Sequence, residues 1–538
     1  MGNLSSHETV ETLRAYQDPY NFESYDDWIA PISNDEQFMR KWHRLILRKL
    51  ELADNNAFSQ VFKSVSREKG EIGYWSEQTF IEFFANTTQR LHTTPSEAKT
   101  FYDLVLQLGS YPYISNPPSD RHTRLDFLTF KSGLMALSGR LTGTSPIASG
   151  FKFGGAAGRK RRRILFMALQ EETSGSSTLE GEMLKVRTEQ DDEDLIDVIK
   201  LFEAYRWEGP NPCLIYQGPL IPHRTAFRSS RSVPRGTVRV EKIWQLLKRL
   251  LTVKLWSFGI DLETPAVQAL DWRGVIEVVM ASGGIDSLTA QSQLRWPEFD
   301  RIFATIPRAS ESLSPLFRPF LSLDPSTALH STATTRKQNA FISHHLTQPP
   351  GKILTLPLLA QILSSTWSNS LYTTPPLNAL SLATHKLEYS GPLSTFEIFL
   401  SRLAPSTRTR KQALIMLEGT TLPANQPFTG GIYLNNNLDE FTTSFVFQAR
   451  PVNRSFAADR EPGEPEHAER MRWRERGVLE TVVRTCVGAG KEAAMVLSMR
   501  GEAKGCLRWD WDGDGMEKEE FRVELVEFIS FGRGRETA

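Results

Sequence analysis

The sequence of 538 residues has little cysteine, no excess of charge of either sign and no long apolar run. Its three cysteines, Cys213, Cys486 and Cys506, show no C-x-x-C spacing, which argues against a disulfide framework or a zinc site and indicates a reducing compartment. Lys and Arg total 63, as do Asp and Glu, so the global positive field of a dedicated nucleic-acid binder is missing. No stretch approaches the roughly 18 consecutive apolar residues of a membrane span. We expect a globular chain of several domains that does not cross a membrane.

The common catalytic motifs are missing as well. The sequence contains no G-x-S-x-G, H-E-x-x-H or Walker pattern, and its histidines are scattered apart from the pair His344 and His345. That pair lies in a Ser/Thr-rich stretch without a third ligand nearby. We therefore predict a protein that is not an enzyme and that binds no cofactor and no metal.

The first six residues, MGNLSS, carry the most specific short signal. Removal of Met1 would expose the amine of Gly2, and Ser6 stands where N-myristoylation favours a serine. A single myristoyl chain binds membranes only marginally, on the order of 10⁴ M⁻¹. Stable membrane residence would therefore need a second contact, either a protein partner or a basic patch.

The first part of the chain shows helical periodicity. We expect an N-terminal lipidation segment and linker over 1–34, followed by a helical region over 35–330. Within that region, 139–158 is predicted to be a loop, 171–194 an acidic connection, and 240–258 an amphipathic helix that Gly259 ends.

The second part changes character after a Ser/Thr-rich linker over 331–351. Two helices are expected near 356–364 and 394–403. Short apolar runs separated by turn residues then predict strands over 413–419, 430–434, 444–449, 493–499 and 521–532. We predict an α+β domain over 352–532, most simply two sheets packed together with helices outside, and a tail over 533–538. No internal repeat is detectable.

The segment SGGIDS at 282–287 resembles the pyrophosphatase loop of ATP-dependent ligases. Its glycines would let backbone N–H groups approach a phosphate, and Ser282, Gly283, Gly284, Asp286 and Ser287 would form the site. The sequence downstream favours helices and lacks the alternating strands that those enzymes need. A Gly-Gly turn in which Asp286 or Ser287 caps the next helix is the preferred interpretation.

The segment DWDGDGMEKEEF at 510–521 resembles a calcium loop in its first half only. Its twelfth position, which should supply a bidentate carboxylate, is Phe521, and the predicted flanking elements are strands. We expect an acidic surface turn.

The segment 58–84 has the helix, glycine turn and helix rhythm of an EF-hand, with Gly73 at the sixth loop position. Its first, third and fifth positions are Glu68, Gly70 and Ile72, which cannot form an oxygen cage. We expect a purely structural pair of helices.

A run of five basic residues is the densest charge in the chain, and its members are Arg159, Lys160, Arg161, Arg162 and Arg163. Such a run is usually the solvated start of a helix. It is also a candidate contact for an anionic lipid surface, and, less favoured, for nucleic acid.

Several segments, taken in their order along the chain, resemble the fungal restriction of telomere capping protein 5 family. In the first part these are VFKSVSREKGEIGYWSEQTFIEFF, FYDLVLQLGSYPYI, GRKRRRILFMAL and LRWPEFDRIF with PLFRPFLS. In the second part they are KILTLPLLAQIL, SGPLSTFEIFLSRL, QALIMLEGT, TGGIYL, SFVFQARP and FRVELVEFISFG. The resemblance covers about 35–532 and implies an EF-hand-like helical scaffold followed by a TLDc β-sandwich with flanking helices.

The resemblance also implies a function. It suggests a cytoplasmic, non-enzymatic lipoprotein whose Gly2 carries myristate and which lies peripherally on the vacuolar membrane. TLDc proteins are associated with oxidative-stress resistance and with the vacuolar proton-pumping ATPase (V-ATPase), whose subunits are the implied partners. The telomere link is genetic, and no specific nucleic-acid partner is implied.

This chain departs from the TLDc pattern at one turn. Where TLDc domains commonly carry Arg-Asp-Gly-Phe-Ser, the sequence has YSGPLS, which keeps Gly391 and Ser394 but loses the charged pair. With Phe396, these are the positions that match the TLDc motif.

Three hypotheses follow from the sequence. The leading one is a myristoylated TLDc interaction protein that modulates assembly of the vacuolar pump. The alternatives are an ATP-dependent ligase using SGGIDS and a chromatin-associated factor using the basic run.

Overall fold

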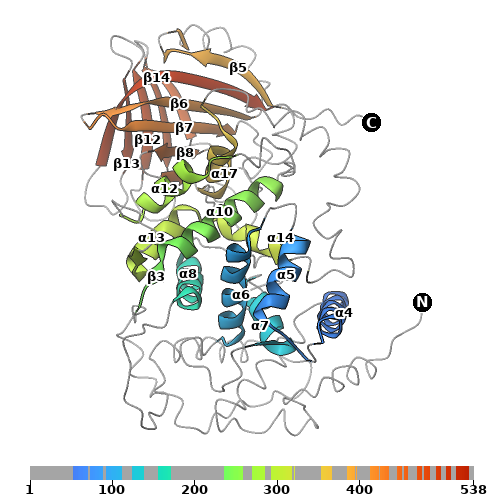
Figure 1. Ribbon diagram of the computed structural model, residues 1–538. Coiled ribbons are helices and arrows are strands. Elements are labelled where there is room, and N and C mark those ends of the chain that lie inside the picture. Colours follow the sequence, from blue (N-terminus) through green and yellow to red (C-terminus); the bar gives the residue numbers. More distant parts are fainter. Residues whose placement is uncertain are drawn as a thin grey trace, which may run out of the picture.

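The protein combines a helical half with a large antiparallel sheet, so its fold class is α+β as predicted (Figure 1). The computed structural model describes the following residues: 52–70, 73–88, 93–111, 124–137, 155–170, 236–257, 270–284, 292–317, 320, 353–365, 385–393, 395–396, 412–422, 424–435, 445–450, 454–457, 469–474, 478–484, 492–498, 504–509 and 517–531.

The helical half begins with two units in which two residues of strand stand between two helices. The elements of the first unit are α4 (Leu52–Glu68), β1 (Tyr74–Trp75) and α5 (Glu77–Thr87), and those of the second are α6 (Pro95–Gly109), β2 (Leu125–Asp126) and α7 (Phe127–Leu137). β1 pairs with β2 in antiparallel fashion, and Trp75 lies opposite Leu125. We call these two units the first pair.

The same arrangement occurs a second time. The elements are α8 (Gly155–Leu169), β3 (Val238–Arg239) and α10 (Val240–Ser257), then α12 (Arg273–Ala281), β4 (Gln293–Leu294) and α13 (Trp296–Thr305). β3 pairs with β4, and the buried Val238 lies opposite the buried Leu294. We call these units the second pair. The backbone arrangement of the first pair recurs in the second pair, but few residue types recur with it, so no repeat was detectable in the sequence.

Local sequence explains where these helices begin. Ser76 caps α5, because its hydroxyl accepts a hydrogen bond from the Thr79 N–H, and Thr94 and Glu97 form a reciprocal capping box at the start of α6. Gly73 and Gly236 precede β1 and β3 with φ of 81° and 100°, a backbone conformation that glycine adopts without strain.

Two short helices and one longer helix complete the helical elements. They are η3 (Ala309–Ser312), α14 (Leu313–Phe317) and α17 (Leu356–Ser365). Phe317 and Phe320 insert among the aromatic rings of the first pair, whereas α17 contacts α10 and α12 of the second pair and β8 (Phe445–Arg450) of the sheet. α17 therefore lies where the two halves of the protein meet (Figure 1).

The sheet has ten strands in the described part of the chain, joined in the order β10-β11-β12-β13-β14-β6-β7-β8-β9, with β5 paired to β14. The strands are β5 (His385–Gly391), β6 (Gln412–Leu422), β7 (Pro427–Asn435), β8 (Phe445–Arg450), β9 (Arg454–Ala457), β10 (Glu469–Arg474), β11 (Val478–Arg484), β12 (Glu492–Ser498), β13 (Lys504–Trp509) and β14 (Glu517–Phe531). All five predicted strands and the helix predicted near 356–364 are present.

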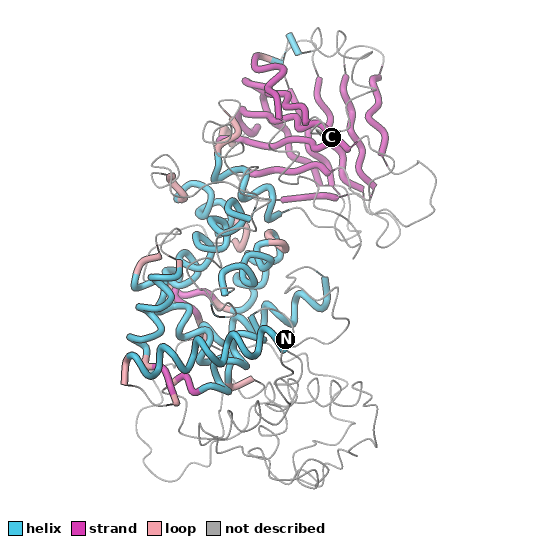
Figure 2. The backbone as a smooth tube through the Cα atoms, turned by 90° about the vertical axis from the view of Figure 1, so that its right-hand side faces the viewer, coloured by secondary structure: helices cyan, strands magenta, loops and turns pink. Residues whose placement is uncertain are grey.

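The prediction of two separate packed sheets was wrong in one respect, because hydrogen bonding runs continuously through a single sheet. The long strand β14 makes this possible. Its first half pairs with β13, its second half with β5, and β6 follows it along the other edge. The two ends of the sheet approach each other, with β12 near β8 and β11 near β9, and enclose a core between them (Figure 2).

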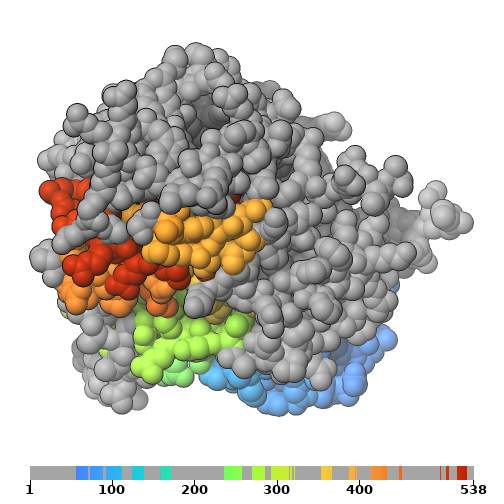
Figure 3. All heavy atoms as spheres, turned by 90° about the horizontal axis from the view of Figure 1, so that it is seen from above, coloured from blue at the N-terminus to red at the C-terminus, as the bar shows by residue number. Residues whose placement is uncertain are grey.

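Strand β6 is buried on both faces, which explains its uninterrupted apolar sequence. Ala413, Ile415 and Leu417 face the core enclosed by the sheet, whereas Leu414 and Met416 join the core that continues into the helical half. The helical half and the sheet therefore share one hydrophobic core across the predicted domain boundary. In the space-filling view, red and orange atoms of the sheet lie directly beside green atoms of the helical half (Figure 3).

Candidate functional site

Of the predicted lipidation and TLDc positions, the structure describes Gly391 and Phe396, whereas the other two, Gly2 and Ser394, lie outside the described residues. Gly391 ends β5, and the Tyr389 hydroxyl lies above it, donating to the Pro392 carbonyl at 2.5 Å. Phe396 is completely buried in the core enclosed by the sheet. Of the matching positions that are described, Phe396 serves packing, and Gly391 leaves room for Tyr389, since an added Cβ would lie 2.8 Å from its hydroxyl.

The basic run does not form the continuous exposed surface that the sequence predicts. It lies within α8, and Arg161 and Arg162 are buried at 6% and 5% exposure. Burial lowers the pKa of Arg162, and the Asp300 carboxylate, 2.7 Å from Arg162 Nε, opposes this. Burial lowers the pKa of Arg161 as well.

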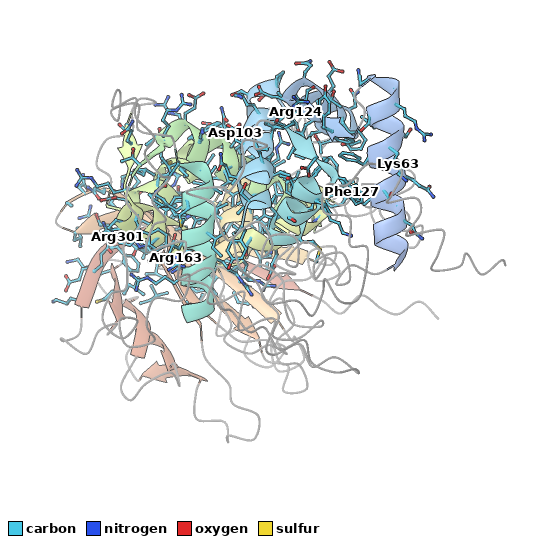
Figure 4. The ribbon with its side chains drawn as sticks, turned by 90° about the horizontal axis from the view of Figure 1, so that it is seen from below. Lys63, Asp103, Arg124, Phe127, Arg163 and Arg301 are labelled. Carbon is cyan, nitrogen blue, oxygen red and sulfur yellow. The ribbon has the colours of Figure 1, made fainter. Side chains whose placement is uncertain are left out.

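The remaining members of the run differ among themselves. The Arg159 side chain is 53% exposed and lies 3.6 Å from Asp300, and Arg163 is partly exposed. The Lys160 side chain lies outside the described residues. Figure 4 shows Arg163 and Arg301 on one side of the helical half, with Lys63 and Phe127 on the other. Burial therefore withdraws Arg161 and Arg162 from contact with an anionic surface or nucleic acid, whereas Arg159 and part of Arg163 reach the surface.

The glycine pair of SGGIDS does not form a phosphate loop. Residues 275–281, which precede it, are helical and belong to α12, and Ser282 is the C-cap of that helix. The Gly283 N–H donates to the Met280 carbonyl at 2.9 Å, and the Gly284 N–H donates to the Ala281 carbonyl at 2.8 Å. Both amides therefore already donate hydrogen bonds within the end of the helix, and they lie at the C-terminal end, whose dipole repels anions. Asp286 and Ser287 lie outside the described residues.

The structure describes only parts of the two calcium-like segments, because 71–72 and 510–516 lie outside the described residues. Phe521, at the twelfth position of the acidic segment, is buried and stacks on Phe428 with 3.8 Å between ring centroids. The strands β13 and β14 flank that segment, as predicted. In the first pair, Thr79 stands six residues after Gly73, at the position where a calcium loop requires a bidentate Glu. Within the described ranges, no three His, Cys, Asp or Glu side chains gather in a way that could hold a metal ion.

Buried charges on α10 were not anticipated from the sequence. Arg249 forms an ion pair with Glu97 of α6, and both side chains are nearly inaccessible. Burial raises the pKa of Glu97, but Arg249, the Thr94 N–H and Lys248 outweigh it and hold this pKa below its ordinary value. This ion pair connects α6 of the first pair to α10 of the second pair.

A second buried cation on α10 lies close to α17. Lys254 is 3% exposed, and its ammonium group is 2.5 Å from the Glu311 carboxylate of η3. Burial lowers the pKa of Lys254 to about 8, although Glu311 opposes this, and Arg308 also approaches Glu311 at 2.9 Å. Lys254 falls on the apolar row of Ile243, Leu247 and Leu250 at helical spacing, and that position was the available sequence signal.

The helix α17 is the element that these contacts position. All ten of its residues are buried. On the helical side, the Arg308 N–H donates to the Ser364 carbonyl at 3.0 Å. On the sheet side, the Gln361 amide donates to the Ala449 carbonyl at 3.1 Å. These hydrogen bonds join α17 to both halves of the protein.

Comparisons with protein families, with curated proteins and with solved structures found no match to this chain. Among the helices of the described residues, none is long and apolar enough to cross a bilayer.

Proposed function

We propose that the protein is a non-enzymatic interaction protein of the TLDc type. One observation carries this proposal. The segments of the second part on which the resemblance rests contribute α17, β5, β6, β7, β8 and β14, and these elements are neighbours in space around β14 and β6. Segments that resemble one domain in sequence order thus share one sheet and the helix that covers it.

The helical half supports the same proposal. Each pair consists of two helix–strand–helix units joined through their short strands, as in an EF-hand pair, and the loop positions of 58–84 cannot form an oxygen cage. We infer an EF-hand-like scaffold that acts structurally and without calcium.

We further propose that myristate on Gly2 recruits the chain to the vacuolar membrane, where the TLDc domain binds V-ATPase subunits and modulates assembly of the pump. Because one myristoyl chain binds weakly, the pump supplies the second contact. The exposed Arg159 and the partly exposed Arg163 add an electrostatic contribution at an anionic membrane surface.

The test compares Gly2→Ala with Leu4→Ala, a matched control that keeps both Gly2 and Ser6. Vacuole-enriched membranes are floated on a density gradient, and pump subunits that copurify with the tagged protein are quantified. We expect Gly2→Ala to leave the membranes and Leu4→Ala to remain. If Gly2→Ala changed neither membrane recovery nor pump copurification, the recruitment mechanism would be wrong.

A separate measurement tests the TLDc assignment without the lipid. The Gly2→Ala chain, purified from the soluble fraction, is mixed with detergent-solubilised pump. Binding of pump subunits by this chain supports an interaction through the folded halves, and failure to bind any of them would remove the proposed partner.

A further inference from the structure

The exposed side of α8 carries arginines and no acid. Arg161 and Arg162 are buried within the helical half. The Arg159 side chain is 53% exposed, and Arg163, one helical turn further along, is partly exposed. Residues 155–169 contain neither Asp nor Glu, so no acid of this helix offsets the exposed arginines.

α8 packs against α13 with the two helices antiparallel. Arg162 of α8 forms an ion pair with Asp300 of α13 at 2.7 Å. One turn later in α8, Phe166 contacts Trp296, which lies one turn earlier in α13, with 5.6 Å between the ring centroids. Contacts that advance along one helix therefore go back along the other, which is the pattern of antiparallel packing.

This packing brings a third exposed arginine to the same side. Arg163 and Arg301 each directly follow a member of the ion pair between α8 and α13. One residue corresponds to about 100° of rotation, and in antiparallel helices this rotation, taken from the contact, leads to the same side of both. Figure 4 shows Arg163 and Arg301 on one side of the helical half, and Arg301 is exposed. We call Arg159, Arg163 and Arg301 the basic face.

One acid of the described residues lies close to the basic face. The Asp300 side chain is 19% exposed, and its carboxylate is 2.7 Å from Arg162 and 3.6 Å from Arg159. Because the shorter contact is with the buried Arg162, most of this negative charge offsets an arginine that does not reach the surface. The basic face therefore keeps an excess of positive charge, although basic and acidic residues are equal in number over the whole chain.

We propose that the basic face lies on the anionic surface of a lipid bilayer and sets the orientation of the protein there. Guanidinium groups bind phosphate through several N–H donors, and these three are spread over two helices, which suits an array of lipid headgroups better than a single ion. In Figure 1, α8 lies farther from the sheet than α12 and α17 do, so the sheet stays free to bind a partner. The inference rests on the membrane recruitment proposed above and assigns the surface that touches the membrane.

The expected strength of this contact follows from its charges. Each arginine near an anionic leaflet strengthens binding about fivefold, so three arginines strengthen it about 100-fold at most. A myristoyl chain alone binds on the order of 10⁴ M⁻¹. The basic face would thus turn marginal binding into stable binding on anionic membranes only, and salt would weaken this gain.

The test uses the full chain produced together with an N-myristoyltransferase. Its affinity is measured for vesicles of phosphatidylcholine and for vesicles that also contain phosphatidylserine. The ratio of the two affinities reports the basic face, and binding to the neutral vesicles reports the acyl chain. We expect Arg159→Gln with Arg163→Gln to lower the ratio at least fivefold. Lys63→Gln with Arg67→Gln removes the same charge at the same spacing from α4, on the other side of the helical half, and should leave the ratio unchanged.

A gain of charge provides an independent check. Ala304 is exposed and lies three residues after Arg301, on the same stripe of α13. Ala304→Lys should therefore raise the affinity ratio about fivefold, and a lysine near the end of a helix also suits its dipole. Ser64→Lys, at an exposed position of α4, is the matched control and should leave the ratio unchanged.

The outcomes separate the basic face from the acyl chain. Unchanged ratios in the folded double arginine variant and in Ala304→Lys would overturn the proposal, and Ala304→Lys decides it alone if the double variant does not fold. Tighter binding to duplex DNA than to the anionic vesicles, at equal phosphate concentration and about 150 mM salt, would also overturn it. A chain that binds anionic vesicles but not neutral ones would refute the acylation and still support the basic face.

Discussion

Replacement of Lys131 by methionine should stabilise the protein, although it removes a charged side chain from a helix. Lys131 lies in α7 and is 1% exposed, and burial lowers its pKa from 10.5 to about 7. At about 1.4 kcal/mol for each tenfold change in proton affinity, this difference corresponds to roughly 5 kcal/mol at acidic pH. Methionine keeps the aliphatic stem of the side chain and needs no hydration of a charge.

The sign and the pH window of this effect follow from linkage. The pKa of Lys131 is lower in the folded chain than in the unfolded chain, so the unfolded chain binds more protons between about pH 7 and 10.5. The contribution of Lys131 to stability therefore rises with pH across that window. We expect Lys131→Met to raise the free energy of unfolding by about 4 kcal/mol at pH 7 and by only about 1 kcal/mol at pH 9.5.

The assay is urea unfolding of the full chain followed by far-ultraviolet circular dichroism at both pH values. Lys69→Met is the matched control, because the Lys69 side chain is 41% exposed and its surface pair with Glu82 should contribute no more than about 1 kcal/mol. A Lys131→Met chain that is less stable than the wild type at both pH values, or whose advantage does not shrink at pH 9.5, would refute the reasoning.

Three further predictions concern packing and charge. Glu97→Gln should lower the free energy of unfolding by about 3–5 kcal/mol in urea, because it leaves Arg249 buried without its acid. Adding Arg249→Met should recover a large part of that loss. Additive losses in the double variant would contradict this prediction. Gly419→Ala should lower the free energy of unfolding by at least about 2 kcal/mol, since the added Cβ would lie 1.8 Å from the Arg522 carbonyl across the β6–β14 pairing. In the control Gly274→Ala, the added Cβ meets only the end of the Arg450 side chain, and the free energy of unfolding should rise by about 0.5–1 kcal/mol. Equal melting temperatures of the two variants would contradict this prediction. A fragment of residues 352–538 should self-associate in sedimentation and bind a hydrophobic dye, because the faces that Met416 and Ile529 present to the helical half lose their cover; a monomeric, dye-negative fragment would show that the halves are independent.

Much of the secondary structure followed from the sequence by itself. The apolar period of 3.6 residues predicted α10, and the boundaries agree within one residue, since tertiary packing reinforces the same face. Apolar runs predicted β6, β7, β8, β12 and β14. The strands β5, β9, β10, β11 and β13 were missed, because polar and charged residues such as those of ERMRWR and HKLEYSG interrupt their patterns, and their pairing in the sheet depends on neighbours distant in sequence.

The candidate site depended more on tertiary structure. A run of five basic residues predicts a basic surface, but packing of α8 within the helical half buries Arg161 and Arg162, and Arg162 pairs with Asp300 of α13. Likewise, a Gly-Gly pair after an apolar run is compatible with a phosphate loop or a helix end, and only the hydrogen bonds of Gly283 and Gly284 distinguish the two.

By itself, the sequence determined the amphipathic helix α10, the strands with uninterrupted apolar runs, that 58–84 encodes no calcium cage, and which ordered segments resemble a TLDc protein. Tertiary structure decided which charges are buried, that the same helix–strand–helix arrangement occurs twice, and that α17 joins the two halves. The physical reason is the separation along the chain over which each kind of interaction acts. Periodicity and capping act between residues a few positions apart, whereas burial, close approach of backbones and ion pairing between residues such as Glu97 and Arg249 depend on segments far apart in the chain.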